Sequence, residues 1–82
     1  MITVYALTTC PWCKKVKIYF EEKDVSFTVV DVDAVPEEEQ KKALAEVERL
    51  TGKRSFPVTV INEKVITGYR PEEFDEVLRN EN

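Results

Sequence analysis

The chain has 82 residues, of which 43% are hydrophobic and 34% are charged, a balance that excludes an intrinsically disordered chain. Its net charge of −4 argues against a nucleic-acid-binding surface, and no stretch approaches the roughly 18–20 apolar residues of a membrane span. The first residues lack the basic region of a signal peptide. We therefore expect one small cytoplasmic domain, residues 1–82, that binds neither nucleic acid nor membrane.

The first half of the chain predicts a strand, a helix and a second strand. Residues 2–7 are β-branched and aromatic, which is typical of a strand buried on both faces. Apolar residues then recur at helical spacing between 11 and 23, and Pro11 suits the first position of that helix. Residues 26–32 predict a second strand, which the helical connection makes parallel to the first.

The second half predicts a helix, a hairpin and a last helix. The second helix opens at Val35-Pro36, and Gly52 suits its C-cap. The side chains expected to be buried along it are Leu44, Val47 and Leu50. Residues 56–61 and 64–67 form the expected hairpin, and Pro71 begins the last helix. The predicted order is therefore β-α-β-α-β-β-α.

Two thiols three residues apart carry the chemistry. Cys10 and Cys13 are the only cysteines, and their spacing suits a pair that cycles between dithiol and disulfide. Cys10 is expected at the N-cap of the first helix, where free backbone N–H groups stabilise a thiolate, and Lys14 and Lys15 are expected to add positive potential. We therefore predict that Cys10 attacks a disulfide and that Cys13 resolves the mixed disulfide. The chain has no histidine, so His-dependent catalysis and His-ligated zinc are excluded.

The element order, the motif Cys10-Pro11-Trp12-Cys13 and Pro57 at the start of the third strand together resemble the glutaredoxin branch of the thioredoxin fold. The resemblance covers essentially the whole chain. It implies an α/β fold in which three helices flank a four-stranded mixed sheet, and a thiol-disulfide oxidoreductase activity. It also implies that Pro57 is cis, faces the thiols, and presents the backbone of Phe56 to an extended substrate segment.

Two segments of the chain bear on the identity of the electron donor, and each indicates a different donor. Residues 68–72, Gly-Tyr-Arg-Pro-Glu, are similar to the Gly-Phe-Arg-Pro-Asp run of the NrdH redoxins. That resemblance implies reduction by thioredoxin reductase and electron transfer mainly to ribonucleotide reductase. Residues 52–55 are similar to the glutaredoxin loop that offers a side chain to a glutathione carboxylate. The resemblance favours an NrdH-type monomer with no bound cofactor that reduces protein disulfides, and leaves glutathione as the alternative donor.

The residues expected around the thiols come from three segments. Trp12 is expected beside the sulfurs, as a docking surface, a shield or a packing residue. Lys53 and Arg54, with Tyr69 and Arg70, are expected to form a small basic patch for a glutathione carboxylate or an acidic partner, although solvated surface charges have the same pattern. Thr8 and Thr9 are expected to satisfy the turn and cap the helix. The supporting residues are Pro11, Trp12, Lys14, Arg54, Phe56, Pro57, Gly68, Tyr69 and Arg70.

Two other function classes stay open. An iron–sulfur or metal carrier needs more thiolates than one chain has, so two chains would each supply Cys10 and Cys13 or would add glutathione thiols. Pro11, and a proline facing the thiols, count against that alternative. Visible absorbance after anaerobic purification would favour it. A non-catalytic binding module with the same fold would leave the intact cysteine pair unexplained, and would be inactive with every thiol donor.

Overall fold

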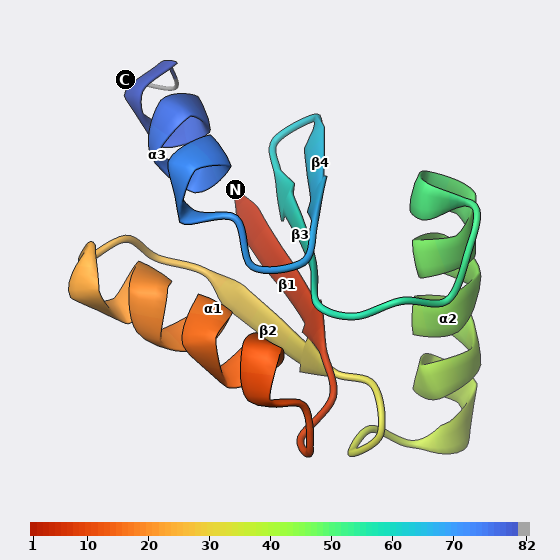
Figure 1. Ribbon diagram of the computed structural model, residues 1–82. Coiled ribbons are helices and arrows are strands. Elements are labelled where there is room, and N and C mark those ends of the chain that lie inside the picture. Colours follow the sequence, from red (N-terminus) through yellow and green to blue (C-terminus); the bar gives the residue numbers. More distant parts are fainter. Residues whose placement is uncertain (81–82) are drawn as a thin grey trace.

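The computed structural model describes residues 1–80, and its seven elements follow the predicted order (Figure 1). The strands are β1 (Ile2–Ala6), β2 (Thr28–Asp31), β3 (Val58–Ile61) and β4 (Lys64–Thr67). The helices are α1 (Pro11–Glu22), α2 (Glu37–Thr51) and α3 (Pro71–Asn80). The predicted β-α-β-α-β-β-α order is confirmed. None of the helices within residues 1–80 has the length and apolar character that a membrane crossing requires.

The four strands form one mixed sheet in the order β2-β1-β3-β4. β1 runs parallel to β2, with Tyr5 opposite Val30, and antiparallel to β3, with Tyr5 opposite Val58. A parallel neighbour ends, and an antiparallel neighbour begins, at the edge where β1 ends. The segment after β1, the segment after β2 and the segment before β3 therefore meet at one edge of the sheet, and that edge carries the cysteines.

The helices lie on both faces of the sheet, with α1 and α3 on one side and α2 on the other (Figure 1). The face under α1 and α3 holds the main core, where Phe20 and Phe74 are fully buried and their ring centroids lie 5.0 Å apart. Truncating either ring to alanine would cost about 3–5 kcal/mol of stability. The buried core cluster comprises Ile2, Val4, Ala6, Cys13, Val16, Phe20, Ile61, Ile66 and Phe74.

The expectation that the first strand is buried on both faces is wrong. Burial alternates along β1: Val4 and Ala6 are inaccessible to solvent, whereas Thr3 and Tyr5 are only partly buried. The physical reason is coverage, because one helix, α2, covers the second face and two helices cover the first (Figure 1). β-Branched and aromatic residues favour a strand in either setting, so residue type alone does not reveal how much of a face is covered.

The second helix also differs from the sequence prediction in its start and in its buried face. Pro36 occupies the N-cap position and the helix proper begins at Glu37. The side chains that are buried on α2 are Ala43 and Val47, and the two leucines expected there, Leu44 and Leu50, are only partly buried. Gly52 is the C-cap, as predicted, and it adopts the left-handed conformation with φ of 80°.

One buried polar group suggests a stabilising substitution. Thr59 lies in β3 between Val4 and Ile66 and is fully buried, and its hydroxyl has no hydrogen-bond partner in residues 1–80. Because a buried polar group without a partner keeps its desolvation cost, we expect Thr59→Val to raise the free energy of unfolding in urea by about 1 kcal/mol. The matched control, Thr28→Val on the exposed surface of β2, should stay within about 0.5 kcal/mol of the parent. A loss of stability in Thr59→Val would contradict the prediction.

Candidate redox site

The turn between β1 and α1 places Cys10 at the start of the helix. The turn is closed by the Cys10 N–H, which donates to the Leu7 carbonyl oxygen at 3.2 Å. Cys10 is the N-cap of α1, and its sulfur accepts the Cys13 N–H at 3.3 Å. Pro11 stands at the first helical position, where its missing N–H costs nothing. The structure thus places Cys10 and Pro11 as the sequence predicted.

Hydrogen bonds make Cys10 the more acidic thiol. Its partial burial alone would raise the pKa, but hydrogen bonds from the Cys13 side chain and N–H, and from the Trp12 N–H, lower the pKa below its ordinary value of 9.0. Lys14 and Lys15, which were expected to add positive potential, are not among the groups that shift this pKa. Lys15 instead places its Nζ 4.5 Å from the centroid of the Trp12 ring.

Cys13 has the opposite character. Its side chain is fully buried, and burial, with the hydrogen bond to Cys10, raises the pKa of the Cys13 thiol to about 12. Both cysteines are free thiols in this structure. At neutral pH the pair therefore consists of one accessible, acidic thiol and one buried, protonated thiol, which is the asymmetry that an attacking and a resolving thiol require.

A hollow of about 290 Å³ lies beside Trp12. Its lining residues are Trp12, Phe56, Pro57, Gly68 and Tyr69. The rings of Trp12 and Tyr69 stack across it with centroids 6.2 Å apart, and Trp12 is 55% exposed. We call it the aromatic hollow. All five residues were singled out from the sequence, and the structure brings them together from three segments.

The Phe56–Pro57 peptide bond in the wall of the aromatic hollow is cis. The Pro57 carbonyl oxygen accepts the Gly68 N–H at 2.8 Å, which ties the segment before β3 to the segment before α3. Gly68 has φ of 81°, a conformation that a side chain would strain. Within residues 1–80 the backbone of Phe56 makes no hydrogen bond to another part of the chain.

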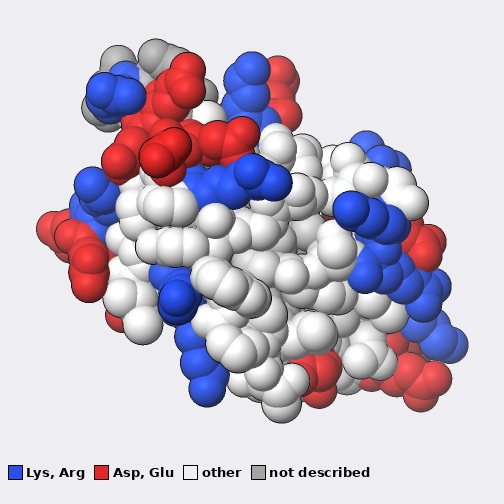
Figure 2. Space-filling view, viewed as in Figure 1, with Lys and Arg blue, Asp and Glu red and all other residues white. Residues whose placement is uncertain are grey.

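The predicted basic residues do not line the hollow. Arg54 Nε lies 2.6 Å from a Glu48 carboxylate oxygen, and Arg70 Nε donates to the Thr67 carbonyl oxygen at 3.0 Å and lies 3.5 Å from Glu73. Figure 2 shows an uncharged area across the middle of the molecule, with Lys and Arg side chains at its margins and acidic side chains gathered over α3. Of the expected basic, aromatic-edged patch, only Tyr69 reaches the hollow.

The sequence did not indicate a role for Asp33. The expectation that Thr8 or Thr9 caps the helix is wrong, because Cys10 is the cap. Thr8 instead donates its N–H and its hydroxyl to the two carboxylate oxygens of Asp33, at 2.9 and 2.7 Å, and these bonds lower the pKa of Asp33. The available signal was topological: Asp33 follows the strand parallel to β1, so the two segments end at the same edge.

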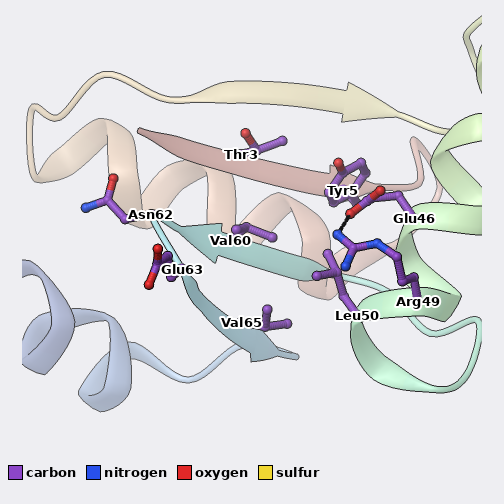
Figure 3. Close-up of a pocket in the computed structure, with 9 residues that line it drawn as sticks. All are labelled: Thr3, Tyr5, Glu46, Arg49, Leu50, Val60, Asn62, Glu63 and Val65. Atoms are coloured by element: carbon purple, nitrogen blue, oxygen red, sulfur yellow. Dashed lines mark hydrogen bonds and ion pairs between the residues drawn. The ribbon is translucent and has the colours of Figure 1, made fainter.

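A second hollow, of about 330 Å³, lies on the other face of the sheet (Figure 3). α2 contributes Glu46, Arg49 and Leu50 to it, and the floor includes Tyr5 and Val60. Glu46 and Arg49 form an ion pair with each other, drawn as the dashed line in Figure 3. Neither cysteine lines this hollow, so it is separate from the redox site.

Metal-ligating side chains do not gather around the thiols. In the described residues 1–80, no three Cys, His, Asp or Glu side chains form a group that could hold a metal ion.

The glutaredoxin family model matches residues 2–66. The chain belongs to the glutaredoxin family. It is 33% identical over 73 residues to the glutaredoxin-like protein NrdH of Lactococcus lactis subsp. cremoris, an alignment that spans 89% of this chain and 93% of that protein. The match to the family model ends before residues 68–72, the segment that most favoured the NrdH type.

Solved structures agree with the family assignment. Methanoredoxin of Methanosarcina acetivorans superposes with a TM-score of 0.90 at 41% identity, over 94% of this chain and 82% of that one. The NrdH-redoxin of Escherichia coli, described as having a thioredoxin-like activity profile, gives a TM-score of 0.71 at 30% identity, over 93% and 92% of the two chains. The predicted thioredoxin-like fold is confirmed, and the chain is a glutaredoxin- or NrdH-like redox protein.

The two thiols should differ in reactivity toward an alkylating agent. We expect iodoacetamide to modify Cys10 of the reduced protein at neutral pH and to leave Cys13 unmodified, because Cys10 is the more acidic and the more accessible thiol. As pH falls through the lowered pKa of Cys10, the thiolate fraction and the alkylation rate should fall together. Peptide mapping by mass spectrometry across acidic to mildly alkaline pH measures both. Equal labelling of Cys13 in the folded protein, or a Cys10 midpoint at or above 9.0, would refute the assignment.

Proposed function

We propose that this protein is an NrdH-type dithiol oxidoreductase that reduces protein disulfides. The observation that carries the proposal is the asymmetric thiol pair on either side of Trp12, a residue that lines the aromatic hollow. The Cys10 thiolate attacks one sulfur of a substrate disulfide, and the other substrate sulfur leaves as a thiolate. Cys13 then loses its proton and attacks the Cys10 sulfur. The second substrate sulfur is released as a thiolate, and the protein is left with a Cys10–Cys13 disulfide. The substrate has then gained two electrons, and a separate reductant must convert the disulfide back to two thiols.

The cis Phe56–Pro57 segment has the features of a substrate-binding edge. The Phe56 backbone groups lack a partner within residues 1–80, and an extended peptide could pair with them as an added strand. The same peptide would lay a side chain over Trp12 and Tyr69, whose stacked rings form the apolar wall. These features favour a polypeptide as the substrate.

The charges around the site favour a protein reductase over glutathione as the electron donor. Glutathione carries two carboxylates, and such ligands are held by cations or by clusters of N–H groups. Among residues 1–80, no charged side chain lines the aromatic hollow, and Arg54 and Arg70 each already lie beside a carboxylate. We therefore propose thioredoxin reductase as the donor and ribonucleotide reductase as a candidate recipient. The similarity to NrdH proteins supports this choice.

The donor can be identified with the oxidised protein. We expect thioredoxin reductase with NADPH to reduce the Cys10–Cys13 disulfide with saturation, and glutathione to reduce it slowly and without saturation. Tyr69→Ala should raise the KM for the reductase several-fold, because it removes one wall of the hollow, while Arg54→Ala should leave it unchanged. Arg49→Ala, on the opposite face, is the matched control. Saturable reduction by glutathione that is weakened in Arg54→Ala would identify glutathione as the donor instead.

The order of attack is tested by trapping. Cys13→Ser should accumulate a mixed disulfide between Cys10 and a substrate protein, because the resolving thiol is absent. Cys10→Ser, the matched control, should accumulate none, since Cys13 is buried and protonated. Non-reducing gels and mass spectrometry of the adduct give the readout. An adduct that forms through Cys13 would reverse the assignment of the two thiols.

Other features of the protein stay predictions. We propose that residues 1–82 act as one domain, as a cytoplasmic monomer with no bound cofactor. The metal-carrier alternative still requires a dimer that brings Cys10 and Cys13 of two chains together. Anaerobic purification separates the two: a coloured, dimeric protein with visible absorbance would favour the carrier.

A further inference from the structure

Asp33 holds the middle of the turn that carries Cys10. Its two carboxylate oxygens accept the N–H and the hydroxyl of Thr8, which is 25 residues earlier in the sequence. The ends of β1 and β2 are joined beside this contact by the Val32 N–H, which donates to the Ala6 carbonyl oxygen at 2.8 Å. We call these two hydrogen bonds from Thr8 to Asp33 the clamp. Asp33 follows the paired strands, and the clamp fixes a turn that lies outside the sheet.

The position of Cys10 depends on that turn. Only Leu7, Thr8 and Thr9 separate β1 from the cap of α1, so a shift of Thr8 displaces Cys10 directly. On the helical side, α1 is fixed because Cys13 and Val16 are buried in the core. The Cys10 sulfur lies 3.3 Å from the Cys13 nitrogen, and a hydrogen bond weakens steeply as its geometry departs from alignment. A displaced turn would therefore remove the sulfur from the N–H groups that stabilise its charge.

We propose that Asp33 is a positioning residue: through Thr8 it keeps the Cys10 sulfur over the first N–H groups of α1 and so keeps Cys10 nucleophilic. The inference rests on the proposed function, in which Cys10 is the attacking thiol. Asp33 does not touch the substrate or the sulfur in this role. It acts through the backbone of the turn.

The sign of the effect separates positioning from simple electrostatics. Asp33 carries a negative charge beside the turn that leads to Cys10, and Lys17, which lies 2.9 Å from Asp31, also interacts with Asp33 and with Cys13. Removing a negative charge would by itself favour a thiolate and lower the pKa of Cys10. Losing the clamp would raise the pKa of Cys10, because its sulfur would lose N–H donors. The two causes therefore predict opposite shifts in Asp33→Ala.

The experiment measures the pH profile of Cys10 alkylation in the reduced protein and in four variants. In Asp33→Ala we expect the midpoint to move upward and the rate below the midpoint to fall by about three- to tenfold, as the thiolate fraction falls. Thr8→Val keeps only the N–H bond to Asp33 and should shift the profile in the same direction by less. Thr8→Ser keeps both donors and should match the parent. Asp75→Ala is the matched control, because Asp75 also accepts a side-chain hydrogen bond from another element, Tyr19 of α1, at a place away from the thiols.

Each outcome decides the proposal. An unchanged or lowered midpoint in Asp33→Ala, with folding retained, overturns it, and an equal upward shift in Asp75→Ala would show a general effect of instability and overturn it as well. If Asp33→Ala does not fold, the Cys10 midpoints of Thr8→Val and Thr8→Ser are compared instead. A higher midpoint in Thr8→Val than in Thr8→Ser supports the proposal, and an equal or lower one overturns it. A parent protein whose Cys10 does not titrate as the reactive thiol would instead reject the proposed function, which separates the two failures.

Discussion

The first N–H groups of an α-helix have no acceptor within the helix, and here the sulfur of Cys10 accepts one of them, the Cys13 N–H at 3.3 Å. This contact gives the two thiols different chemistry although only two residues separate them. The hydrogen bonds that lower the pKa of Cys10 act together with the burial that raises the pKa of Cys13. A pair of equivalent thiols would have no defined order of attack, so the redox function follows from where this helix begins.

The sheet determines what surrounds that helix start. Because β2 is parallel and β3 antiparallel to β1, three segments distant in sequence meet where β1 ends. They bring Asp33 to the turn, the cis Phe56–Pro57 bond to Trp12 and, through the Gly68 N–H, Tyr69 to Trp12 as well. None of these contacts needs a long insertion. The site is therefore a property of strand direction as much as of the residues in it.

Local features were predictable from the sequence, and features that depend on tertiary coverage were not. The N-cap position of Cys10, the left-handed Gly52 and the hairpin follow from short patterns that act within a few residues. The partial exposure of Tyr5 depends on α2 covering only part of a face. The Thr8–Asp33 contact joins residues with no local pattern in common, and the partners of Arg54 and Arg70 depend on where side chains meet in space. A charge in a sequence shows that a cation is present, but not whether a carboxylate has already engaged it.

Whether a cation near the site already has a carboxylate partner affects which molecules the site would bind. Arg54 and Arg70 are solvent-exposed, and exposed ion pairs add little stability, so their carboxylate partners matter for recognition more than for the fold. An anionic tripeptide would have to displace Glu48 or Glu73 and would then face their repulsion. An apolar side chain that packs over Trp12 and Tyr69 meets no such cost and removes aromatic surface from water. Specificity for polypeptides would thus arise from cations that are already neutralised beside an aromatic surface that is not yet covered.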